Sequence, residues 1–241
     1  MSLDIFIPHF EILPAPQREI WDALSPMKHL GFCLYGGTAI ALQLGHRASV
    51  DFDFFSEIAL DSAMESQMIE ALPVLSDSDI LQKEVNTRTF RTPCGVKLSF
   101  FGGINFGRVG NPLLTEDGVM IVASVEDLLA TKLAVILQRV EYKDYKDIAA
   151  ILESGISLIE GLGAARALYG RQFPPSESVR ALTYFHGGDL SLLSEKDKKV
   201  LRQAVEKLDI RRLPERLIVS EKLAGNIDCG FSSDKTFAPK M

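Results

Sequence analysis

Cysteine is scarce in this chain of 241 residues, which has only Cys33, Cys94 and Cys229. An odd and widely spaced set provides neither a disulfide framework nor the paired spacing of a structural zinc site. The first ten residues lack a basic region and a long apolar run, so no secretion signal is expected. No stretch approaches the length that crosses a bilayer. These absences predict a cytoplasmic protein with no membrane association.

The chain also lacks an excess of positive charge. It has 26 Lys and Arg against 32 Asp and Glu, which gives a net charge of −6 and a pI of about 5.3. This balance argues against a large generic nucleic-acid surface, although a local basic groove remains compatible with it. Apolar residues make up 46% of the chain. The length and this composition predict one large globular domain or two smaller ones.

The most informative stretch begins with an apolar run, residues 32–35, that ends at Gly36 and Gly37. The run predicts a short buried strand, and the double glycine predicts a sharp turn with accessible backbone N–H groups. Thr38 is expected to cap a helix over residues 39–44. The start of such a helix presents N–H donors and the positive end of a dipole, which favour phosphate oxygens.

A second strand is expected over residues 50–55, immediately after this helix. Alternation places Asp51 and Asp53 on one face, and Val50, Phe52 and Phe54 on the other. Two carboxylates on one strand face repel each other, and a divalent cation relieves the repulsion. Mg²⁺ prefers one or two carboxylates together with phosphate oxygens, and Mn²⁺ accepts similar ligands. The stretch therefore predicts a nucleoside triphosphate site that uses Mg²⁺ or Mn²⁺.

Each feature also has a structural explanation. A Gly-Gly turn is common before a helix, and an Asp-x-Asp pair on a strand is usually a solvated face. The combination is more specific, because Arg47 and Ser49 lie between the two features. Arg47 would contact phosphate or fix the loop, and Ser49 would cap the turn into the strand.

The segments Gly-Gly-Thr-Ala and Gly-His-Arg-x-Ser-x-Asp-Phe-Asp-Phe-Phe resemble the nucleotidyltransferase fold of the DNA polymerase β superfamily. The resemblance is closest to the AbiEii-type proteins of bacterial abortive-infection and type IV toxin–antitoxin systems. It implies an α/β (α+β) fold, with a mixed sheet flanked by helices and a mostly helical C-terminal part. It further implies two metal-binding aspartates and nucleotide transfer from an NTP to an acceptor hydroxyl, and it makes an antitoxin a candidate partner.

A second stretch begins at Ser124, which has the features of a helix N-cap. Lys132 and Arg139 lie on one face of this helix, and Asp144 and Asp147 open the next. By resemblance to the AbiEii-type motif, Lys132 reaches the triphosphate, Asp144 lies close to the active site, and Arg139 and Asp147 orient these groups. The alternative is a set of surface ion pairs between two helices.

One departure from the family pattern concerns the strand over residues 96–101. Polymerase-β-like enzymes usually place a third carboxylate there, but this strand has Lys97 and Ser99 on the corresponding face. Three explanations stay open. The acid comes from Glu84 or Glu57, two aspartates suffice, or the site binds nucleotide without transferring it.

We therefore predict an α/β nucleotidyltransferase-like domain over residues 1–123, a helical domain over 124–225 and a loose tail over 226–241. Asp51, Asp53, Lys132 and Asp144 would be catalytic in the cleft between the domains. The acceptor would be RNA, protein or a small molecule. A nucleotide-binding module that acts through a partner, and a purely structural protein, are the alternatives. Nucleotide contacts are expected from Gly36, Gly37, Thr38, Arg47, Ser49, Lys132 and Arg139.

Overall fold

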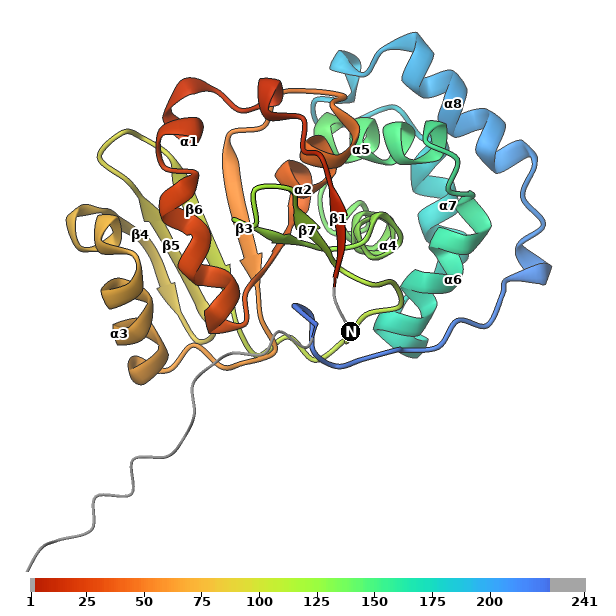
Figure 1. Cartoon of the computed structure of the whole chain (residues 1–241). Coiled ribbons are helices and arrows are strands. Elements are labelled where there is room, and N and C mark those ends of the chain that lie inside the picture. Colours follow the sequence, from red (N-terminus) through yellow and green to blue (C-terminus); the bar gives the residue numbers. More distant parts are fainter. Residues whose placement is uncertain (1–2, 226–241) are drawn as a thin grey trace, which may run out of the picture.

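A computed structural model describes residues 3–225 of the chain (Figure 1). Eight strands form one sheet in the order β1-β7-β8-β2-β3-β6-β5-β4. The pairs β1–β7, β2–β8 and β3–β6 are parallel and the others antiparallel, so the predicted mixed sheet is confirmed. The strands are β1 (Asp4–Phe6), β2 (Cys33–Tyr35), β3 (Asp51–Phe55), β4 (Asp79–Glu84), β5 (Thr87–Arg91), β6 (Lys97–Phe101), β7 (Leu113–Thr115) and β8 (Ile121–Val122).

One face of the sheet is an aromatic core. Phe54 stacks on Phe100 of the neighbouring strand with ring centroids 5.1 Å apart, and Phe52 lies 6.0 Å from Trp21. The segment that carries Trp21 has the apolar spacing of one helix over residues 17–30, with Ile20, Trp21, Leu24 and Met27 on one face. It is instead a short helix α1 (Ala15–Glu19) followed by the 3₁₀ helix η2 (Asp22–Leu30), which contains Pro26. Proline removes a backbone donor, so a continuous α-helix is unfavourable here.

Most of the remaining helices follow the sheet in sequence and lie beside it, on the right of Figure 1. Helix α4 begins where Ser124 accepts a hydrogen bond from the Asp127 N–H, so the predicted N-cap is confirmed. It packs against α5 and α6, and α5 packs against α8. The helices are α2 (Gly36–Leu44), α3 (Ser62–Ala71), α4 (Val125–Val135), α5 (Tyr142–Glu153), α6 (Leu158–Tyr169), α7 (Pro175–Thr183) and α8 (Glu195–Glu206).

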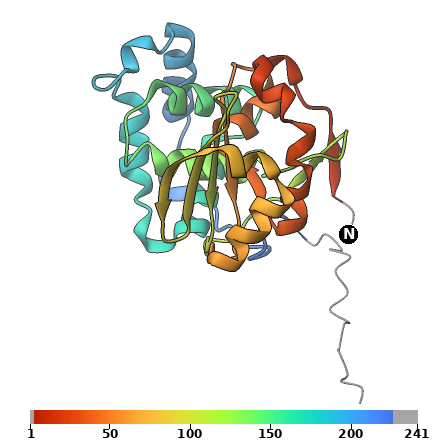
Figure 2. The same cartoon turned by 90° about the vertical axis from the view of Figure 1, so that its left-hand side faces the viewer.

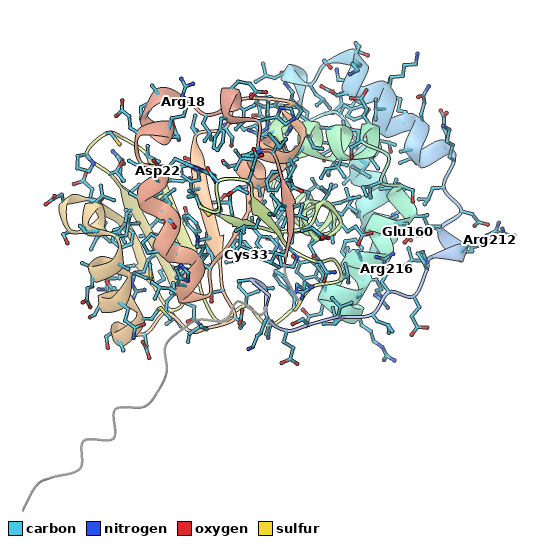
Figure 3. The ribbon with its side chains drawn as sticks, viewed as in Figure 1. Arg18, Asp22, Cys33, Glu160, Arg212 and Arg216 are labelled. Carbon is cyan, nitrogen blue, oxygen red and sulfur yellow. The ribbon has the colours of Figure 1, made fainter. Side chains whose placement is uncertain are left out.

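The last described segment returns from the helices to the sheet. Arg216 makes ion pairs with Glu126 at 2.9 Å and Glu160 at 2.8 Å, and Figure 3 shows Arg216 and Glu160 side by side. Further along, the backbones of Arg108 and Ser220 form an antiparallel bridge. This segment therefore contacts both the helical part and the loop that follows β6. The predicted tail, residues 226–241, lies outside the described residues.

The opposite end of the sheet presents β4 as an edge strand, toward the viewer in Figure 2 with α3 beside it. All six residues of β4 are exposed.

Within residues 3–225, no single helix is long and apolar enough to cross a membrane. The helical stretches Tyr142–Glu153 and Leu158–Gln172 meet that requirement only as a pair, which is bent by 120°.

Candidate functional site

A cleft of about 840 Å³ opens between the polar face of the sheet and helices α4 and α5. Its walls come from the β2–α2 turn, β3, β6 and the α4–α5 region. Every residue predicted to be catalytic or nucleotide-binding lines it, although these residues are spread over more than a hundred positions of the chain. They are Gly36, Gly37, Thr38, Arg47, Ser49, Asp51, Asp53, Lys132, Arg139 and Asp144.

The two aspartates lie on β3 as the alternation predicted, with both side chains turned toward the cleft. The parallel pairing with β6 places Asp51 opposite Lys97 and Asp53 opposite Ser99. Lys97 Nζ lies 3.1 Å from Asp51 Oδ2. The Ser99 hydroxyl lowers the pKa of the Asp53 carboxyl that lies opposite it. The residues that replace the expected third acid are therefore direct partners of the two aspartates.

Burial raises the pKa of Asp53 above its ordinary value, and the neighbouring Asp51 carboxylate adds to this rise. Lys97, Lys132 and the Ser99 hydrogen bond lower the pKa, but they offset only part of the effect. The folded protein therefore holds the Asp53 carboxylate in surroundings that disfavour its charge. A bound cation would favour the ionised form.

The double glycine is explained by two close approaches. Gly36 has φ +70°, and a Cβ there would lie 2.5 Å from Asp53 Oδ2. A Cβ on Gly37 would lie 2.2 Å from an Arg47 guanidinium nitrogen. The missing side chains thus let the Asp53 carboxylate and the Arg47 guanidinium contact the first turn of α2.

We expect Gly36→Ala to destabilise the fold by more than the strain of its backbone conformation alone. A left-handed conformation costs a non-glycine residue about 1–2 kcal/mol. Gly118 is a matched control, because it also has φ +70° but has open space around the position of a Cβ. Denaturant unfolding should show a larger loss for Gly36→Ala than for Gly118→Ala. Equal losses would contradict the close approach of Asp53.

The prediction that Thr38 caps α2 is wrong, because the helix begins at Gly36 and includes Thr38. The Thr38 hydroxyl instead hydrogen-bonds the backbone oxygen of Asp51 and the Ser49 hydroxyl, the latter at 2.7 Å. Thr38 and Ser49 are both buried. Their hydroxyls therefore tie α2 to the start of β3 and hold the metal-binding candidates in position.

A buried charge network forms the wall opposite the aspartates. Asp147, which is fully buried, receives Lys132 Nζ at 2.8 Å and Arg47 Nε at 2.6 Å. A nitrogen of His46 lies 2.7 Å from the same carboxylate. Asp147 thus joins the loop between α2 and β3 to helix α4. Asp147 itself does not line the cleft, so its effect on the site is exerted through Arg47 and Lys132.

Asp144 completes this network one helical turn earlier on α5. Lys132 Nζ lies 2.6 Å from Asp144 Oδ1, and Arg139 Nε lies 2.9 Å from Asp144 Oδ2. Asp144 is fully buried, whereas the Arg139 side chain is 52% exposed. These residues do form ion pairs between the two helices, as the alternative expects. The expected surface location is wrong for Lys132, Asp144 and Asp147, which are all buried.

The charges of the network fix its protonation. Burial alone would raise the pKa of Asp147, but Lys132, His46 and Arg47 outweigh it and hold that pKa far below its ordinary value. Burial alone would lower the pKa of Lys132, yet Asp147 and Asp144 keep it above the ordinary value. The pKa of Asp144 is lowered, because Arg139 and Lys132 outweigh its burial. Lys132 is therefore a cation at neutral pH, and it lines the cleft.

Neither candidate for a third acid reaches the cleft. Glu84 is exposed on the edge strand β4, and Glu57 accepts a hydrogen bond from the Leu223 backbone at 3.1 Å. Within residues 3–225, no group of three or more His, Cys, Asp or Glu side chains is arranged to hold a metal ion. Asp51 and Asp53 are hard oxygen ligands on one strand face, and this pair fits Mg²⁺ or Mn²⁺ when phosphate oxygens supply further ligands.

His46 and Lys97 are site residues that sequence reasoning did not assign. His46 sits next to Arg47 in the quoted Gly-His-Arg segment, which was the available signal. Its other ring nitrogen, Nδ1, is buried without a hydrogen-bond partner among the described residues. Lys97 was noted only for replacing an acid, because the pairing of β3 with β6 depends on tertiary structure.

The mixed sheet, the paired aspartates of β3 and the adjacent double-glycine helix start are those of the nucleotidyltransferase class. The chain belongs to the AbiEii family, described as nucleotidyl transferase AbiEii toxin of type IV toxin–antitoxin systems, whose family model matches residues 26–218. It is also similar to the uncharacterized protein aq_aa25 of Aquifex aeolicus (strain VF5). The identity is 32% over 176 residues, which cover 70% of this chain and 82% of that relative.

Proposed function

We propose that the cleft transfers a nucleoside monophosphate from an NTP to an acceptor hydroxyl on RNA, protein or a small molecule. The observation that carries the proposal is the meeting of Asp51 and Asp53 with the start of α2 and with a buried cation, Lys132, in one cleft. Membership of a toxin–antitoxin family supports an antitoxin as the regulatory partner.

Asp51 and Asp53 would hold Mg²⁺ or Mn²⁺, which when bound would neutralise triphosphate oxygens. The N–H groups at Gly36 and Gly37 would donate to phosphate at the positive end of α2. Lys132 has three N–H donors, and its two contacts with carboxylates leave one for a phosphate oxygen. Arg139, half-exposed at the rim, would contact the triphosphate from solvent.

These charges would matter most as the α-phosphate is transferred, when negative charge moves onto the leaving pyrophosphate. Fixed cations that are already oriented stabilise such charge without reorganisation. The Asp144 and Asp147 carboxylates would keep Lys132 oriented between them. Asp144 would thus act as a positioning residue next to the phosphates.

A second candidate function is a nucleotide-binding module that does not turn over and acts through a partner. The pairing of Lys97 with Asp51 favours it, because a lysine replaces the acid expected to assist the attacking hydroxyl. Retention of both aspartates and of the Lys132 network favours the transferase.

The test is incubation with each of four α-labelled NTPs, Mg²⁺ or Mn²⁺, and a bacterial extract that contains RNA and protein. Asp53→Asn is run in parallel. We expect one NTP to label one acceptor band, and this label to be absent with the variant. This outcome would identify the nucleotide and the acceptor class together.

Absence of label, with Mg²⁺-dependent NTP binding measured separately, would reject the transferase in favour of the binding module. Absence of both label and NTP binding would reject both proposals. In that case Asp51→Asn and the wild type would have equal stability with and without Mg²⁺-NTP.

A further inference from the structure

The Lys97–Asp51 contact changes how many cations the site can hold. Lys97 lies directly opposite Asp51 in the parallel pairing of β3 and β6, on the face that lines the cleft. Its Nζ is 3.1 Å from Asp51 Oδ2, and the two side chains are about equally exposed, at 41% and 39%. The ammonium is therefore accessible from the cleft and lies beside one oxygen of a candidate metal ligand.

Two-metal sites place their ions about 3.5–4 Å apart, so bridging carboxylates must offset the repulsion between the ions. Here the anionic side chains on this face of β3 are Asp51 and Asp53, and β6 contributes a cation and a hydroxyl in place of a carboxylate. A second divalent ion at Asp51 would be repelled by the Lys97 ammonium. It would also lack a third carboxylate as a ligand. Both effects disfavour it.

We propose that the site binds a single divalent cation, and that the Lys97 ammonium occupies the side of Asp51 where a second would bind. This inference rests on the proposed function and makes it more specific. Asp53 and the free oxygen of Asp51 hold the one ion together with the triphosphate. Lys97 supplies fixed positive charge beside the other oxygen of Asp51.

The stoichiometry of Mn²⁺ binding tests the proposal without reference to turnover. Mn²⁺ is titrated into the full chain, alone and with α,β-methylene analogues of each of the four NTPs, and electron paramagnetic resonance counts the bound ions. The variants are Lys97→Glu, which restores a third carboxylate, and Lys97→Met, which removes the charge. Lys199→Glu is the control, because it makes the same charge change at an exposed lysine on α8.

We expect one Mn²⁺ per wild-type chain and two per Lys97→Glu chain. Lys97→Met should bind the first ion on the order of fivefold more tightly, because a partly exposed competing cation is removed. Lys199→Glu should match the wild type. Circular dichroism melts establish that each variant is folded.

Two bound ions in the wild type, with no change in Lys97→Glu, would overturn the single-ion proposal and leave the proposed function intact. No bound Mn²⁺ in any chain, with or without the analogues, would overturn both. The two failures are thus distinguishable from one titration series.

Discussion

Asp147→Asn is expected to lower the free energy of unfolding by about 3–5 kcal/mol. The substitution is nearly isosteric, so the loss comes from charge and not from a cavity. It removes the carboxylate that faces Arg47, Lys132 and His46 at 2.6–2.8 Å in a fully buried position. A buried cation that loses its partner keeps its desolvation cost, and this accounts for the size of the effect.

Denaturant unfolding at neutral pH measures this loss. Glu153→Gln is the matched control, because it neutralises one acid of an ion pair with Lys196 that is exposed. Exposed pairs contribute about 0–1 kcal/mol, so the control should change stability little. Similar losses in the two variants would contradict the assignment of Asp147 as the central carboxylate of a buried network.

The stability difference between the wild type and Asp147→Asn should also depend on pH, in a direction that the pKa shift of Asp147 determines. Because the folded-state pKa of Asp147 lies below the ordinary value of 3.8, its contribution is complete above that value. The contribution is lost as the pH falls toward the folded-state pKa. The difference in stability between the wild type and Asp147→Asn should therefore be constant from pH 6 to 8 and narrow below about pH 4.

Local patterns were sufficient to predict much of the site. The strand–glycine–helix–strand order around residues 33–55 and the helix start at Ser124 follow from short-range rules and are confirmed. The prediction that Thr38 caps α2 failed because the sequence shows a residue type that favours capping. It does not show that the backbone oxygen of Asp51 accepts a hydrogen bond from the Thr38 hydroxyl.

Long-range pairings could not be predicted in this way. Arg47 and Asp147 are a hundred residues apart, and their ion pair depends on how α5 packs beside α2. The placement of Lys97 against Asp51 depends on the order of strands in the sheet. The division into domains at residues 123 and 124 stays a prediction, as do the roles of the site residues.

The second prediction is that one substitution, Asp53→Asn, lowers activity and raises stability. Asp53→Asn is expected to reduce nucleotide transfer by at least about a thousandfold. It should also raise the free energy of unfolding at neutral pH by about 0.5–1 kcal/mol. The site holds the Asp53 carboxylate in surroundings that raise its pKa, so ionisation of that group opposes folding. An uncharged amide avoids this opposition, but it is a much poorer ligand for a hard cation.

The size of the stability change depends on pH. A carboxyl group whose folded-state pKa is above its unfolded value favours the folded state at low pH, and this contribution is lost as the pH rises through the folded pKa. The gain from Asp53→Asn should therefore appear at neutral pH and shrink below the ordinary carboxyl pKa of 3.8.

Asp79→Asn is the control, because it makes the same change of net charge as Asp53→Asn at a position outside the cleft. Asp79 is an exposed acid at the start of the edge strand β4 and does not line the cleft. Its substitution should leave both transfer and stability near the wild-type values. Transfer by Asp53→Asn at the wild-type rate would exclude Asp53 as a metal ligand. A loss of stability in the same variant would show instead that the carboxylate is structural. The expected combination is a protein that is more stable and inactive. It would mean that the Asp53 carboxylate is needed for nucleotide transfer although it lowers the free energy of unfolding.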